Sequence, residues 1–81
     1  MIPHRNEMAP VIPSLIGATA SSEAIREALA DHFDVTSADR AEMRGKHKAF
    51  DNEVAFAIVK CLREGTLVKP DPRKFEYRAA H

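Results

Sequence analysis

Residues 51–78 constrain the fold more than any other part of the sequence. Apolar side chains spaced by three and four residues predict an amphipathic helix that buries one face; they are Val54, Ile58, Cys61 and Leu62. Asp51 is a favourable N-cap for this helix, and Gly65 stands where a glycine commonly ends one. The segments TLVK, PDPR and KFEYR then predict a strand, a turn and a strand. The inward face of this hairpin is expected to carry Leu67, Phe75 and Tyr77.

Three further helices are expected before this one. The first, over residues 4–17, has a helical apolar spacing, but its prolines predict a kink or a start near Pro10. The second covers about residues 22–33, and a short third helix begins at a capping box that starts with Thr36. A mainly helical chain that ends in a small β-hairpin is typical of a winged helix-turn-helix, in which the hairpin is the wing. A plain four-helix arrangement with a frayed tail fits the periodicity nearly as well.

Length and composition favour one domain, residues 1–81, in a reducing compartment. A chain of 81 residues holds one small hydrophobic core at most. Its one cysteine, Cys61, cannot form an intramolecular disulfide and is expected to be a small core residue. No apolar run approaches the roughly 20 residues of a membrane span, and the first residues lack the apolar stretch of a secretory signal. A cytoplasmic protein is therefore expected.

The net charge is zero, but the two halves of the chain differ in charge. Residues 1–39 carry two cations against six anions, whereas residues 40–81 carry ten cations against six anions. This asymmetry favours an anionic partner for the C-terminal half. The signal is modest, because most independent DNA-binding domains are more basic than this chain.

Cationic residues gather just before the predicted helix. The segment RGKHK is expected to be a loop in which Gly45 is free to take a positive φ, and it contains Arg44, Lys46, His47 and Lys48. In a helix-turn-helix, the turn and the start of the second helix face the major groove or its phosphates. These side chains are therefore candidates for contacts with double-stranded DNA. An exposed polar loop without any partner explains them about equally well.

Three more residues are candidates for DNA contacts. Asn52 can form two hydrogen bonds with adenine, although Asp51 and Glu53 beside it would repel phosphates. A purely structural role for Asp-Asn as a helix cap is at least as good an explanation. Arg73 and Lys74 lie at the expected tip of the wing, where they could grip an adjacent groove. A plain soluble turn is the alternative for the PDPR segment.

Three stretches of the chain resemble the N-terminal winged-helix domain of the Mrr family of restriction endonucleases. They are IPHRNEMAPVI, SEAIREALADHFDVTSADRAEM and GKHKAFDNEVAFAIVKCLREGTLVK, and the third has the most specific pattern. Phe56 stands where that family usually has a tryptophan, and PDPRK replaces a glycine common at the tip of its wing. The resemblance implies a winged helix that binds DNA in a restriction or phage-defence setting. A small DNA-binding module of this kind could equally act in transcriptional regulation.

Catalysis is not expected. The segment PDPRKFEYR superficially resembles the acidic core of a nuclease, but an arginine replaces the lysine and all its residues lie on one short hairpin. His4, His32, His47, His81 and Cys61 lack the spacing of zinc ligands. No metal or cofactor is therefore predicted.

A protein partner is the second functional hypothesis. A chain with no net charge and an acidic N-terminal half could keep the fold without the DNA contacts, as an adaptor or as a phage-encoded inhibitor of a bacterial defence complex. A homodimer is also open, with Met8 or Phe56 as candidate interface residues if they are exposed. An excised domain of a longer nuclease is the third alternative.

Overall fold

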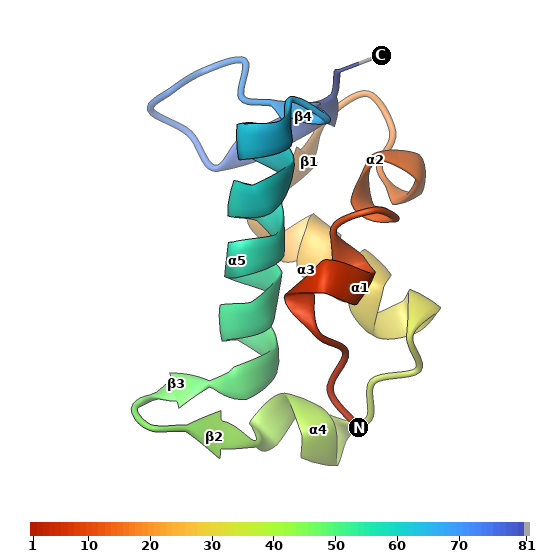
Figure 1. Cartoon of the computed structure of the whole chain (residues 1–81), viewed down its shortest axis with the longest axis vertical. Helices are drawn as coiled ribbons and strands as arrows, with labels where there is room; N and C mark the ends of the chain where they lie inside the picture. The colour runs from red at the N-terminus through yellow and green to blue at the C-terminus, as the bar shows by residue number, and fades with distance from the viewer. Residues whose placement is uncertain (81) are drawn as a thin grey trace.

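The helix α5 (Ala49–Glu64) runs along the long axis of the molecule in the computed structural model, which describes residues 1–80 (Figure 1). Its buried face follows the predicted apolar spacing and contains Phe50, Val54, Ala57, Ile58 and Cys61. Gly65 ends the helix with φ 80°, a left-handed conformation that favours glycine. The position and the end of this helix are therefore confirmed.

The start of α5 differs from the prediction, because Asp51 is not its N-cap. The N-cap is Lys48, whose side chain makes no capping hydrogen bond. Ala49 and Phe50 are fully buried, and the Ala49 N–H donates to the Glu42 carbonyl at 2.9 Å. The burial of Ala49 and Phe50 thus accompanies a helix start that lies before Asp51, the residue favoured as N-cap by its side chain. Asp51 lies in the first turn, where its charge still suits the helix dipole.

The N-terminal segment forms two short helices instead of one kinked helix. They are α1 (Arg5–Met8) and α2 (Ile12–Leu15), with Pro10 between them. His4 caps α1, because its Nδ1 accepts from the Asn6 N–H at 3.1 Å. A proline in the interior would have broken a continuous helix, and the two short pieces avoid that cost.

The next two helices agree with the predicted order, and a short strand precedes them. β1 (Ala20–Ser21) leads into α3 (Ser22–His32), and the Ser21 hydroxyl caps that helix by accepting from the Ala24 N–H. The capping box at Thr36 starts α4 (Ser37–Ala41). In Figure 1, α1, α2 and α3 lie on one side of α5.

The C-terminal segment is a paired β-hairpin and not a frayed tail. β4 (Leu67–Val68) pairs antiparallel with β5 (Glu76–Ala79), which also pairs with β1, so that the order of the sheet is β1-β5-β4. Leu67 and Tyr77 are buried as predicted. The prediction for Phe75 is wrong: its side chain is 69 % exposed, because Tyr77 fills the inward position and Phe75 precedes the strand.

The fold is therefore mainly helical with small antiparallel sheets. One hydrophobic cluster joins α5 to α1, α2, α3 and the hairpin, and includes Met8, Ile12, Ile25 and Leu29. Met8 is fully buried, which removes it as a candidate for a dimer interface. Cys61 is buried as expected, and its thiol donates to the Ala9 carbonyl at 3.1 Å. Within residues 1–80, no helix has the length and apolar character needed to cross a membrane.

Candidate nucleic-acid interface

The RGKHK segment is part of a second, smaller β-hairpin and not an irregular loop. β2 (Met43–Arg44) pairs with β3 (His47–Lys48) through the partners Met43–Lys48 and Arg44–His47. Gly45 is the first of the two turn residues and has φ 65°, the region that two-residue hairpin turns require there. β3 leads directly into α5, so the hairpin is attached to the start of the longest helix.

Four cationic or potentially cationic side chains on this hairpin are exposed, and Arg44 is the one that pairs with Glu53; the other three are Lys46, His47 and Lys48. Lys46 lies in the turn, and His47 and Lys48 form β3. Within the described part of the chain, none of the three makes an ion pair with a carboxylate. They can therefore meet an anionic partner without first breaking an internal contact.

Asn52 lies beside these cations. It is half-buried and lines an open surface hollow of about 330 Å³ together with Lys46, His47, Lys48, Asp51 and Ala55. Because α5 begins at Ala49, Asn52 stands inside the helix and cannot cap its N-terminus. The capping role that the sequence suggested for the Asp-Asn pair is therefore wrong. Asn52 therefore remains a candidate for contacts with DNA, as one of the residues that line the hollow.

We expect Asn52→Ala to change the free energy of unfolding by less than about 0.5 kcal/mol, because the substitution removes no cap and the helix favours alanine. Urea unfolding followed by circular dichroism measures this change. In DNA-binding experiments the matched variant is Asn52→Asp, which keeps the size of the side chain but adds a negative charge. A loss of about 1 kcal/mol in Asn52→Ala would restore the structural role.

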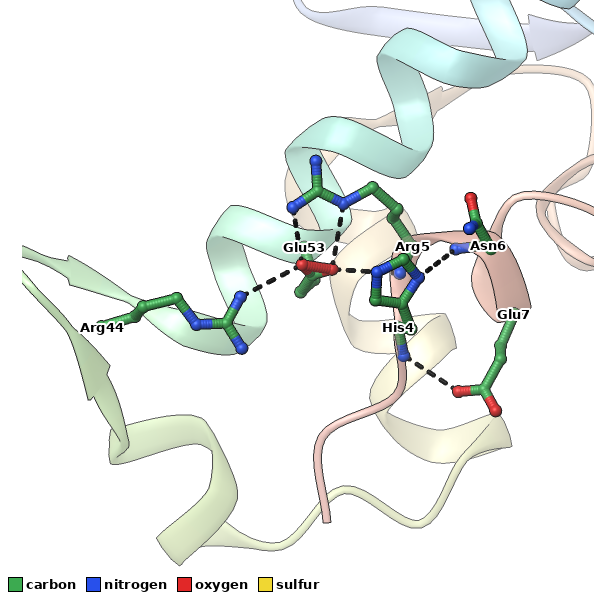
Figure 2. Close-up of polar contacts among 6 residues, drawn as sticks. All are labelled: His4, Arg5, Asn6, Glu7, Arg44 and Glu53. Carbon is green, nitrogen blue, oxygen red and sulfur yellow. Dashed lines mark hydrogen bonds and ion pairs between the residues drawn. The ribbon is translucent and has the colours of Figure 1, made fainter.

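Glu53 is the buried charge that fastens the hairpin to α5. Its side chain is nearly inaccessible, and its carboxylate receives hydrogen bonds from two arginines (Figure 2). Arg5 donates from Nη2 to Oε1 at 2.9 Å and from Nε to Oε2 at 3.3 Å, and its backbone N–H donates to Oε2 at 3.0 Å. Arg44 donates from Nη1 to Oε1 at 3.2 Å. One carboxylate thus joins the N-terminal segment, the hairpin and α5.

The surroundings of Glu53 stabilise its charged form. Hydrogen bonds and positive charge from Arg5, with a further hydrogen bond from Arg44, lower the pKa of Glu53 below its ordinary value despite burial. Arg5 also lies over the Phe56 ring, with its guanidinium carbon 3.9 Å from the ring centroid. Glu53 therefore faces the interior, and Arg44 is partly engaged by the protein itself.

The two carboxylates that flank Asn52 are neutralised within the protein. Glu53 is bonded to both arginines, and Asp51 forms an ion pair with Arg26 of α3 at 3.6 Å. The repulsion of phosphates that the sequence suggested is thereby reduced. The importance of Glu53 was missed, although its position between Phe50 and Ala57 on the buried face was a usable signal.

Arg73 and Lys74 lie apart from the other candidates. They belong to the exposed loop between β4 and β5, at the opposite end of α5 from the β2–β3 hairpin (Figure 1). A helix of 16 residues is about 24 Å long. Arg73 pairs with Asp71 at 3.6 Å, and the Lys74 N–H donates to the Asp71 carbonyl at 3.1 Å. The structure thus groups Arg44, Lys46, His47, Lys48 and Asn52, and leaves the loop residues separate.

Comparison of the chain with protein-family models, curated proteins and solved structures finds no match. Among residues 1–80, no three histidine, cysteine, aspartate or glutamate side chains lie close enough together to hold a metal ion. His81 lies outside the described residues. The geometry of the β2–β3 hairpin and the exposed face of α5 therefore carries the functional argument.

Proposed function

We propose that this protein is a non-catalytic, winged-helix module that binds double-stranded DNA. The observation that carries the proposal is the β2–β3 hairpin, which presents Lys46, His47 and Lys48 beside Asn52 at the start of α5. Lysines at such a site neutralise phosphates, and the first turns of the helix would face base edges. Arg44 is the fourth cation of the hairpin; its side chain is partly exposed and also pairs with Glu53.

The order of the elements supports the winged-helix part of the proposal. α4 and α5 follow one another as the two helices of a helix-turn-helix would, with the β2–β3 hairpin in place of the usual short turn. The β4–β5 hairpin follows as the wing, and β1 adds a third strand to it. Arg73 and Lys74 on this wing would reach phosphates about one helix length from the first contact.

The distribution of charge supports an anionic partner. Asp51 and Glu53 are engaged by arginines, whereas Lys46 and Lys48 are exposed and form no ion pair in the described chain. The surface at the start of α5 is thus more cationic than the zero net charge suggests. The resemblance of the sequence to the Mrr domain supports a role in restriction or phage defence, and transcriptional regulation is the other role proposed for such a DNA-binding module.

A titration of a fluorescein-labelled random DNA duplex at several salt concentrations tests the proposal. We expect log K to fall linearly with log salt, with a slope of about −2 from Lys46 and Lys48 alone and a steeper slope if the wing also binds. Fluorescence anisotropy measures the affinity. A single-stranded DNA of the same length is the control that shows whether binding requires the double helix. Absence of salt-dependent affinity for any duplex would contradict the proposal.

A protein partner is the second candidate function, and exposed apolar side chains favour it. Phe56 and Val59 on α5 and Phe75 before β5 are all exposed. Such residues are common at protein interfaces. An adaptor or an inhibitor of a defence complex would use this surface without salt-dependent binding to DNA, so the same titration separates the two functions.

A further inference from the structure

The exposed face of α5 is polar at its start and apolar in its middle. Asn52, Ala55 and Val59 follow one another at three- and four-residue steps, so they lie along one side of the helix. Ala55 is exposed, and the Val59 side chain is 45 % exposed despite its apolar character. A solvated helix face would ordinarily carry polar residues at these positions. Ala55 and Val59 therefore form an exposed apolar pair on this face of α5.

Ala55 connects this apolar pair to the cationic hairpin. It lines the hollow that contains Lys46, His47 and Lys48 and also a neighbouring hollow of about 280 Å³ between α5, α3 and β5. The second hollow contains Val59 and Phe75 as well. The apolar surface and the exposed cations are thus continuous at Ala55.

Cations lie at both ends of this surface. Lys46 and Lys48 lie at the start of α5, and Lys69 lies at the other end, with Nζ 4.6 Å from the Phe75 ring centroid. The anion along the intervening face, Asp51, is paired with Arg26. An occupant with complementary chemistry carries anions beside a row of small apolar groups. A DNA major groove has this pattern, with phosphates at its edges and thymine methyl groups on its floor.

We infer that Ala55 and Val59 read thymine, by contacting its C5-methyl group in the major groove beside Asn52. This inference rests on the proposed function. In the proposed complex α5 lies along the groove. Residues 55 and 59 are about 6 Å apart along the helix, which is close to two base steps of about 3.4 Å each. The two side chains therefore reach methyl groups about two base pairs apart. Asn52 would meet an adenine in the same run, so the site is rich in A·T pairs.

Replacing thymine by deoxyuridine tests the inference, because it removes the methyl group and leaves the charge and base pairing unchanged. Duplexes are first enriched from a random pool on the wild-type protein, and each thymine of the enriched duplex is then replaced singly. We expect about fourfold weaker binding for each methyl group that is contacted. The effect should be confined to a few positions, including two that are about two base pairs apart.

Val59→Ala identifies the residue responsible. This variant should bind the thymine duplex more weakly and lose most of the discrimination at one of the two positions. Val35→Ala is the matched control, because Val35 is half-buried beside α3 and lines a different hollow. It should keep the full discrimination.

The possible failures are distinguishable. Enrichment with no effect of any thymine replacement, or duplex binding with no enriched sequence, overturns the thymine contact and leaves DNA binding intact. Unchanged discrimination in Val59→Ala overturns the assignment to this residue pair. Absence of salt-dependent binding to every duplex overturns both proposals.

Discussion

Replacing Glu53 with alanine is expected to lower the free energy of unfolding by about 3 kcal/mol. The substitution removes the carboxylate that joins Arg5 and Arg44 and leaves the Arg5 backbone N–H without its acceptor. The value lies at the low end for a broken buried ion pair, because the two arginine side chains are 33 % and 55 % exposed and regain water. A domain of this size has only about 4–12 kcal/mol of stability in total, so the loss is large.

Glu53→Gln separates the charge from the shape of the side chain. It keeps an oxygen acceptor for Arg5 and is expected to cost about 1–2 kcal/mol. The exposed pair between Lys60 and Glu64, at 3.1 Å on the same helix, supplies the control. Glu64→Ala should cost less than about 0.5 kcal/mol. Urea unfolding measures all three variants, and equal stability of Glu53→Ala and Glu64→Ala would show that the network contributes nothing.

The contribution of the Glu53 charge depends on pH. Its pKa is lowered in the folded protein from an ordinary value of 4.5, mainly by hydrogen bonds from Arg5. A carboxylate whose pKa is lowered stabilises the fold above its unfolded pKa, and this stabilisation is lost as pH falls through the folded pKa. The difference in stability between the wild type and Glu53→Gln should therefore be constant near neutral pH and shrink below about pH 4.5.

The sequence predicted those elements whose signals are local. The spacing from Val54 to Cys61, the glycine at 65 and the capping box at Thr36 each act within a few residues. They placed α5, its end and the start of α4 correctly. The turn residues around PDPR likewise predicted the β4–β5 hairpin.

The sequence failed where distant residues decide the structure. Glu53 is buried because Arg5, 48 residues earlier in the chain, neutralises it, and no local pattern indicates that contact. The start of α5 is fixed by the burial of Phe50 and not by the capping preference of Asp51. Phe75 was assigned inward by strand alternation, but Tyr77 occupies the space beneath β5. Burial in three dimensions overrode the local preference in each case.

The sequence predicted which residues belong to the candidate site but not that its cations lie on a β-hairpin. Its cations were recognised from the RGKHK segment, whereas its hairpin geometry depends on the pairing of β2 with β3 and on the attachment of Arg44 to Glu53. That attachment gives the hairpin a fixed base on α5. Loss of the Glu53 carboxylate is therefore expected to loosen the β2–β3 hairpin, the surface proposed to contact DNA, as well as the fold.

The double substitution Lys46→Ala and Lys48→Ala is expected to weaken binding to duplex DNA on the order of 100-fold at about 50 mM salt. Each lysine that contacts a phosphate releases about 0.9 counterion, so the salt slope should fall by about two units in magnitude. Both side chains are exposed and make no ion pair within residues 1–80. The free energy of unfolding should therefore change by less than about 0.5 kcal/mol. Fluorescence anisotropy at about 50 and about 200 mM salt measures the slope.

A second double variant separates a local contact from the effect of total charge. Lys60→Ala and Arg78→Ala remove the same net charge, but Lys60 already pairs with Glu64 and faces the Arg5 side of α5, and Arg78 is an exposed residue of β5. A long-range effect of net charge would weaken binding equally in both variants. Contact of the β2–β3 hairpin with phosphates predicts that only the Lys46 and Lys48 variant loses about two units of slope. Equal slopes in the two variants would remove this hairpin from the interface, even if the protein binds DNA elsewhere.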